Sequence, residues 1–134
     1  MTTDNHSSGL TDKPNGSGFT RVIKATQCSI LGLKAAYKYE SAFRQEFWLC
    51  LLLMPLAWWI TSSLADFLIL VSVMLFVMVV EIINSAVEAV VDRIGLERHE
   101  LSGRAKDLGS AAVMLSLVIA GLTWSAYIIK FLSN

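Results

Sequence analysis

Three long apolar blocks in this 134-residue sequence limit the folds that are open to it. Residues 47–64 carry no charge, residues 67–80 form an apolar run that continues helically, and residues 109–131 carry only Lys130. A helix needs roughly 20 mainly apolar residues to cross the hydrocarbon core of a bilayer, so each block can span it. In lipid, segments of this length satisfy their backbone hydrogen bonds as helices. We therefore expect an all-α membrane protein with three transmembrane helices, at about 47–64, 67–92 and 109–132.

The segment before the first block has a different composition. Residues 1–17 are polar and rich in Ser, Thr, Gly and Asp, which predicts a disordered tail. Residues 19–46 place apolar side chains between cations at helical spacing, with Lys24, Lys34 and Lys38 among the latter. This pattern is typical of an amphipathic helix that lies on the membrane surface, with its cations near anionic head groups. The sequence thus predicts a tail followed by one membrane domain over residues 18–134.

The positive charges are distributed unevenly along the chain. Six of the eleven Lys and Arg residues precede the first apolar block, four lie around the connection after the second, and the last is Lys130. The short link at residues 61–66 has none. Since cytoplasmic loops carry an excess of Lys and Arg, we expect the N-terminus and the loop around Glu97 to be cytoplasmic. Cys28 and Cys50 are expected to be unpaired thiols.

The second apolar block carries a stripe of polar side chains. Glu81, Asn84, Glu88 and Asp92 follow one another at steps of three, four and four, which places them on one face of a helix. They extend over about 16 Å, from within the membrane to its cytoplasmic boundary. A carboxylate near hydrocarbon must face protein, water or a cation, and Mg²⁺ favours carboxylates together with substrate phosphates. The deep Glu81 can act as a base and the shallower Glu88 as a metal ligand, although polar contacts between helices would give the same pattern.

A second polar cluster occupies the loop at residues 96–111. Arg98, His99, Arg104 and Lys106 can bind the oxygens of a triphosphate, but charge alone favours an ordinary cytoplasmic loop. The glycine-rich phosphate loops and the catalytic motifs of soluble kinases are missing from the sequence. Any phosphoryl transfer by this chain must therefore use a different scaffold.

Several strings of the sequence resemble one known family. EIINSAVEAVVDRIG at 81–95, followed by HELSGRAKDLGSAAV at 99–113, closely resembles the most characteristic stretch of the prokaryotic integral-membrane diacylglycerol kinases. GFTRVIKA at 18–25, SILGLKAA at 29–36 and ESAFRQE at 40–46 resemble its surface-helix motifs in the same order. The resemblance implies a homotrimer in the bacterial inner membrane, with active sites shared between subunits. It also implies ATP and Mg²⁺, and conversion of diacylglycerol to phosphatidic acid on the cytoplasmic side.

The resemblance also implies roles for individual residues. Glu81 looks like the catalytic base, Glu40 and Glu88 look like the metal ligands, and Asn84 and Asp92 look like supporting residues. The implied nucleotide contacts, besides the two metal ligands, are Arg21, Cys28, Glu97, Arg98, His99, Lys106 and Asp107. The implied lipid-substrate contacts, besides Arg21 and Glu81, are Ser29, Lys34, Ala42, Phe43, Arg44, Gln45, Glu46, Trp59 and Ser110.

Two alternatives remain open at this point. The first is a kinase of undecaprenol, a longer lipid with a single hydroxyl group, from the same family. The sequences SGRAKDLGSA and ESAFRQE resemble the diacylglycerol branch, so we prefer diacylglycerol as the substrate. A channel subunit could use Glu81 and Glu88 as an ion or proton path. Residues 67–80 offer only Ser72 as a polar continuation of such a path, which argues against a channel.

Overall fold

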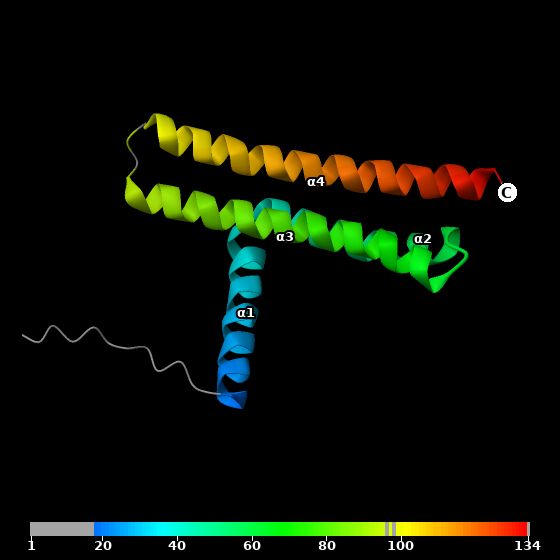
Figure 1. Cartoon of the computed structure of the whole chain (residues 1–134), viewed down its shortest axis with the longest axis horizontal. Coiled ribbons are helices and arrows are strands. Elements are labelled where there is room, and N and C mark those ends of the chain that lie inside the picture. Colours follow the sequence, from blue (N-terminus) through cyan, green and yellow to red (C-terminus); the bar gives the residue numbers. More distant parts are fainter. Residues whose placement is uncertain (1–17, 96, 98, 134) are drawn as a thin grey trace, which may run out of the picture. The chain divides into compact units, whose positions relative to one another are not determined.

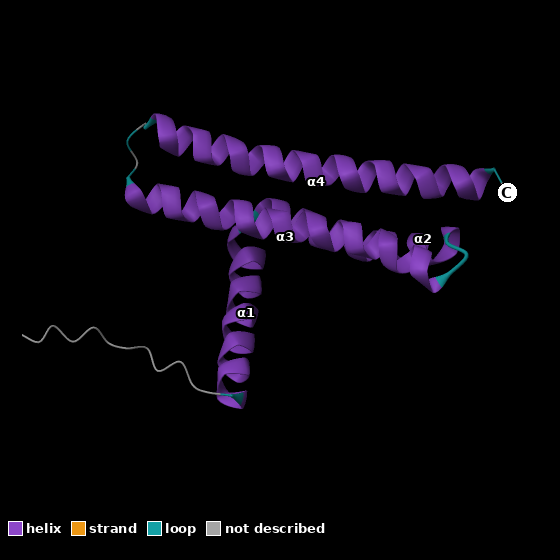
Figure 2. Ribbon diagram, viewed as in Figure 1, coloured by secondary structure: helices purple, strands orange, loops and turns teal. Residues whose placement is uncertain are grey.

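The computed structural model describes residues 18–95, 97 and 99–133 of the chain. It contains the helices α1 (Phe19–Tyr39), α2 (Ser41–Ile60), α3 (Leu64–Ile94) and α4 (Glu100–Leu132), shown in Figures 1 and 2. Since the described residues form helices and no strands, the predicted all-α class is confirmed. The chain divides into two compact units, of which the first ends at Leu33 and the second begins at Lys34. The predicted tail at residues 1–17 lies outside the described residues.

One helix boundary differs from the predicted one. The segment expected to form a single surface helix, residues 19–46, is interrupted at Glu40, whose backbone is extended with φ −100° and ψ 113°. Residues 41–46 therefore belong to the same helix as the first apolar block. Neither Gly nor Pro occurs at this interruption, so the residues that usually mark a helix end did not predict it.

Arg44 stabilises the interruption from the first turn of α2. Its guanidinium group donates hydrogen bonds to the carbonyl oxygens of Tyr37 and Lys38, at 3.0 and 3.1 Å. The last carbonyls of a helix have no partner within the helix, so a nearby cation satisfies them. The Tyr37 ring also meets the Phe47 ring edge to face, with 5.8 Å between centroids. The end of α1 is thus tied to the start of α2.

α3 and α4 run side by side in opposite directions, as Figure 1 shows. They contain 31 and 33 residues, and both are long and apolar enough to cross a membrane. At about 1.5 Å per residue each exceeds the roughly 30 Å of the hydrocarbon core, so each helix can also extend into the head-group region. The third predicted transmembrane helix, which corresponds to α2, remains a prediction.

The main hydrophobic core joins α2, α3 and α4 on the side of the 61–63 link. Ala57 of α2 and Leu70 of α3 are completely buried there, and Trp124 of α4 is 8% exposed. Beyond this core, most large apolar side chains of the helices are exposed, including Leu122 at 68%. So much exposed apolar surface is unfavourable in water but is what lipid chains require. The helices therefore bury a narrow seam and present their remaining faces outward.

A polar contact closes the same end of the bundle. The Tyr127 hydroxyl donates a hydrogen bond to Asp66 Oδ1 at 2.7 Å, and Lys130 Nζ lies 3.9 Å from Asp66 Oδ2. Ser63 caps the start of α3 by accepting a hydrogen bond from the Asp66 backbone N–H. These contacts link α3 and α4 where the apolar core ends.

The packing of Leu70 gives a test of this fold. We expect Leu70→Ala to lower the free energy of unfolding by about 2–4 kcal/mol, because it leaves a cavity in a fully buried seam. Leu122→Ala, which removes the same atoms from an exposed site, should change it by much less. SDS titration in mixed micelles, followed by circular dichroism, measures both values. Equal effects of the two substitutions would contradict the packing described here.

Candidate active site

The predicted polar stripe lies on one continuous helix. Glu81 sits near the middle of α3 and is only 6% exposed, Asn84 and Glu88 are half-buried, and Asp92 is exposed near the end of the helix. The apolar run at residues 67–80 and the polar stripe that follows it belong to the same unbroken helix. Burial of the side chains therefore decreases along the stripe from Glu81 toward Asp92.

Further carboxylates lie near Glu81, two from the start of α2 and one from α3 itself. Glu40, Glu46 and Glu88 each lie close enough to Glu81 to interact with it electrostatically. Glu40 occupies the position before the first turn of α2, yet its side chain makes no capping hydrogen bond. We call these four residues the carboxylate cluster. Because like charges repel most strongly where water is scarce, a cation would stabilise the cluster.

The cluster contains both a satisfied and an unsatisfied carboxylate. Asn84 Nδ2 donates a hydrogen bond to Glu88 Oε1 at 3.1 Å, which fixes the orientation of that carboxylate. By contrast, Glu46 Oε2 is buried and has no hydrogen-bond partner among the described residues. A buried polar atom without a partner is uncommon and points to a missing ligand, proton or neighbouring group.

The donor set suits a hard cation, but the described residues of one chain do not form a complete metal site. Within residues 18–95, 97 and 99–133, no three His, Cys, Asp or Glu side chains are grouped tightly enough to enclose a metal ion. Mg²⁺ does not need such a cage, since it commonly binds one or two carboxylates together with waters and substrate phosphates. The carboxylates of Glu40 and Glu88 are ligands of the kind that Mg²⁺ uses when it binds with a nucleotide.

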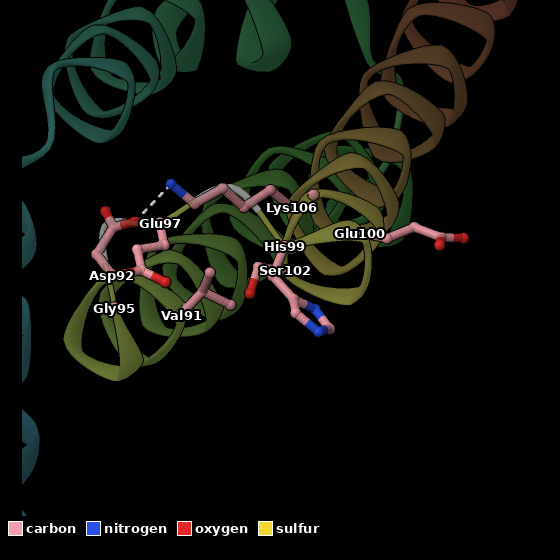
Figure 3. Close-up of a pocket in the computed structure, with 9 residues that line it drawn as sticks. Val91, Asp92, Gly95, Glu97, His99, Glu100, Ser102 and Lys106 are labelled. Carbon is pink, nitrogen blue, oxygen red and sulfur yellow. Dashed lines mark ion pairs between the residues drawn. The ribbon is translucent and has the colours of Figure 1, made fainter.

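A cavity of about 580 Å³ lies at the end of the bundle where α3 meets α4. Figure 3 shows the side chains that line it, and Glu100 points away from the others. The lining residues are Val91, Asp92, Gly95, Glu97, His99, Glu100, Ser102, Gly103 and Lys106. Its size is within the range of small-molecule sites, and the N-terminus of α4, which favours anions, opens into it.

Lys106 connects the cavity with the carboxylate cluster. Its Nζ atom lies 2.6 Å from Asp92 Oδ1, the ion pair drawn as a dashed line in Figure 3, and it also interacts electrostatically with Glu88. An ammonium group beside two acidic residues stays charged. Spacing alone did not predict that Asp92 would be its partner, because the two residues come from different helices.

Some other predicted site residues make contacts that stabilise the helices. His99 Nδ1 accepts a hydrogen bond from the Leu101 backbone N–H and so caps α4, while Glu97 is exposed beside it. Phe43 is buried, and the Trp59 ring packs against Phe131 near the end of α4, with 6.2 Å between centroids. Arg44, as described above, caps α1.

The remaining predicted contacts are surface residues. Ala42 is half-buried, whereas Lys34, Gln45, Asp107 and Ser110 are exposed. Arg21, Cys28 and Ser29 are exposed on α1, in the unit that ends at Leu33, and their roles stay predictions. Arg98 lies outside the described residues.

Sequence reasoning missed several residues of the site. Gly95, Ser102 and Gly103 line the cavity, and Gly109 of α4 lies against Asn84. The strings SGRAKDLGSA and DRIG contained them, but small residues carry no charge pattern that would single them out. Only the packing of α4 against α3 identifies them.

The fold and the site together define an all-helical membrane protein. Its carboxylate cluster lies beside a cavity whose lining includes the Lys106 ammonium group. The sequence profile of the family described as prokaryotic diacylglycerol kinase matches residues 27–128. The diacylglycerol kinase of Escherichia coli is 54% identical over 110 residues, which cover 82% of this chain and 90% of that protein. The protein of the same name from Haemophilus influenzae is 50% identical over 108 residues, which cover 81% and 92%. That from Pseudomonas aeruginosa is 41% identical over 113 residues, which cover 84% and 92%.

The chain belongs to the prokaryotic diacylglycerol kinase family. The predicted family is thereby confirmed, as is the prediction that the protein is an enzyme, a lipid kinase. These comparisons establish the family and the enzyme class. The roles of individual residues remain predictions.

The ion pair of Lys106 gives a test of the cavity. We expect Lys106→Met to weaken binding of a fluorescent ATP analogue by about tenfold or more, because a charge-assisted contact to phosphate is lost. Lys130→Met, at the other end of α4, should leave the dissociation constant unchanged. Unchanged binding by folded Lys106→Met protein would exclude the cavity as a phosphate site.

Proposed function

We propose that the protein transfers the γ-phosphoryl group of ATP to the free hydroxyl of diacylglycerol, which forms phosphatidic acid and ADP. The carboxylate cluster around the buried Glu81 carries this proposal, since a lipid kinase needs a base at membrane depth and a cation site beside it. The curated relatives named diacylglycerol kinase support the choice of lipid.

Glu81 acts as the general base in this proposal. It accepts the proton of the lipid hydroxyl while that oxygen forms a bond to the γ-phosphorus, and the bond from phosphorus to the β,γ-bridging oxygen breaks. Its position in α3, where it is 6% exposed, suits a hydroxyl group on the glycerol backbone of a lipid that is held in the membrane. Catalysis of phosphoryl transfer requires mainly that the reactants are positioned and that charge is neutralised. A base, a metal site and a few cationic side chains are therefore sufficient.

Glu40 and Glu88 hold Mg²⁺ with the nucleotide phosphates. The bound ion supplies positive charge to the phosphate oxygens and relieves the repulsion within the cluster. The Asn84 amide keeps Glu88 oriented, and Asp92 keeps Lys106 beside the same region. Lys106 then contacts the phosphates, while the cavity at the start of α4 accommodates the rest of ATP.

The proposal includes an arrangement in the membrane. α2 is a third span beside α3 and α4, and the end of the bundle that carries the cavity faces the cytoplasm, together with the N-terminus. The excess of Lys and Arg on this side supports that orientation. Three chains associate, and neighbouring subunits complete each active site, which accounts for unsatisfied groups such as Glu46 Oε2 in a single chain.

Replacement of the proposed base tests the reaction directly. In mixed micelles with Mg²⁺ and labelled ATP, the unmodified protein should label dioleoylglycerol, and Glu81→Gln should lower the rate by about 100-fold or more. Asp66→Asn, an equivalent change near the other end of α3, should retain the rate, because the amide oxygen can still accept the Tyr127 hydrogen bond.

The same assay separates the alternatives. Stronger labelling of undecaprenol than of dioleoylglycerol would assign the longer lipid as substrate. No labelling of either lipid by well-folded protein would refute the kinase reaction and favour a channel role for the carboxylates.

Binding of Mg-ATP should also raise the melting temperature of the detergent-solubilised protein, because a ligand that binds the native state stabilises it. We expect the shift to require Mg²⁺ and to be lost in Glu88→Gln, which lacks a proposed metal ligand. Thermal unfolding measured with ATP, with Mg²⁺ and with both gives the three values. A shift of equal size in Glu88→Gln would contradict the metal role of Glu88.

A further inference from the structure

Gly109 of α4 packs against Asn84 in the polar stripe of α3. A Cβ atom built on Gly109 would overlap Asn84 Oδ1, and it would lie 3.2 Å from Asn84 Cγ and 3.8 Å from Asn84 Cα. The other described glycines, which include Gly103 and Gly121 of the same helix, have nothing within 4 Å of such an atom. Among the described glycines, Gly109 alone is required by its surroundings to lack a side chain.

The atom that needs this space belongs to the residue that orients Glu88. Asn84 has one amide, and its nitrogen donates to Glu88 Oε1 at 3.1 Å. A carboxylate only accepts hydrogen bonds, so the amide oxygen must point the other way, toward Gly109. That oxygen is buried and has no hydrogen-bond donor among the described residues. It faces a Gly109 Cα hydrogen instead, a weak contact that a methyl group would replace with a clash.

We propose that Gly109 is a positioning residue of the kinase reaction, which acts on the metal ligand Glu88 through Asn84. The bare backbone of α4 at this point leaves room for the Asn84 amide in the one orientation that donates to Glu88. This proposal rests on the proposed function of Glu88 as a Mg²⁺ ligand. A side chain at position 109 moves the Asn84 amide, and the Glu88 carboxylate then loses the donor that holds it in place.

The proposal predicts an effect on metal dependence that is specific to one glycine. Gly109→Ala should raise the Mg²⁺ concentration for half-maximal activity by about tenfold, the size expected when a hydrogen bond to a charged group is lost. Gly121→Ala on the same helix should leave it unchanged and should not destabilise the protein, since alanine favours helix more than glycine does. A purely structural role of Gly109 would lower stability or maximal rate without this shift.

A double-mutant cycle identifies Asn84 as the intermediary. Asn84→Ala should raise the half-maximal Mg²⁺ concentration by a similar factor, because the same donor is missing. Adding Gly109→Ala to Asn84→Ala should cause no further change, since the amide is gone and the nearest of the remaining atoms, Asn84 Cα, is in ordinary contact at 3.8 Å. If Gly109→Ala alone fails to fold, the double variant should fold, because the clash has been removed.

Two results would overturn the proposal. Effects of the two substitutions that multiply in the double variant would show that Gly109 acts independently of Asn84. A Gly109→Ala protein with unchanged Mg²⁺ dependence would show that the contact does not position Glu88. Failure of the underlying assignment gives a different result, in which Glu88→Gln itself retains the Mg²⁺ dependence of the unmodified protein.

Discussion

The low polarity of the bilayer is the constraint on which the rest of this structure depends. Water cannot satisfy backbone groups or charges in hydrocarbon, so long segments become helices and an intramembrane carboxylate must face protein. Glu81 obeys this rule, since it is 6% exposed on a helix whose other faces are largely apolar and exposed. Glu40 and Glu88 add like charge beside it and increase the cost of placing it there, so a nearby cation would stabilise all three carboxylates.

Three parts of the chain form the site, each for a different physical reason. α3 supplies Glu81, Asn84 and Glu88 through helical periodicity alone. Glu40 is supplied by the interruption between α1 and α2, where an extended residue leaves its side chain without a capping role. α4 contributes through packing, because Lys106 pairs with Asp92 and Gly109 admits the Asn84 amide. The site thus combines a rigid stripe with contacts that exist only after the helices associate.

This division explains how much the sequence could predict. Apolar blocks and a spacing of three and four residues are local signals, so the all-α class and the stripe from Glu81 to Asp92 followed from them. The interruption at Glu40 did not, because Arg44 stabilises it by contacts with carbonyls six and seven residues earlier rather than by a Gly or Pro signal. The pairing of Lys106 with Asp92 and the role of Gly109 depend on the register of α4 against α3, which a single sequence does not encode locally. The family resemblance supplied the roles of individual residues, and these remain predictions.

The central claim is that Glu40 and Glu88 bind a divalent cation together with the nucleotide. Mn²⁺ can replace Mg²⁺ as a paramagnetic probe of such an oxygen-ligand site. Electron paramagnetic resonance of the full protein in micelles, with a non-hydrolysable ATP analogue, measures the Mn²⁺ that is bound beyond the amount held by the free analogue. The account predicts such binding in the unmodified protein and its loss in both Glu40→Gln and Glu88→Gln. Equal Mn²⁺ binding by all three proteins would contradict it.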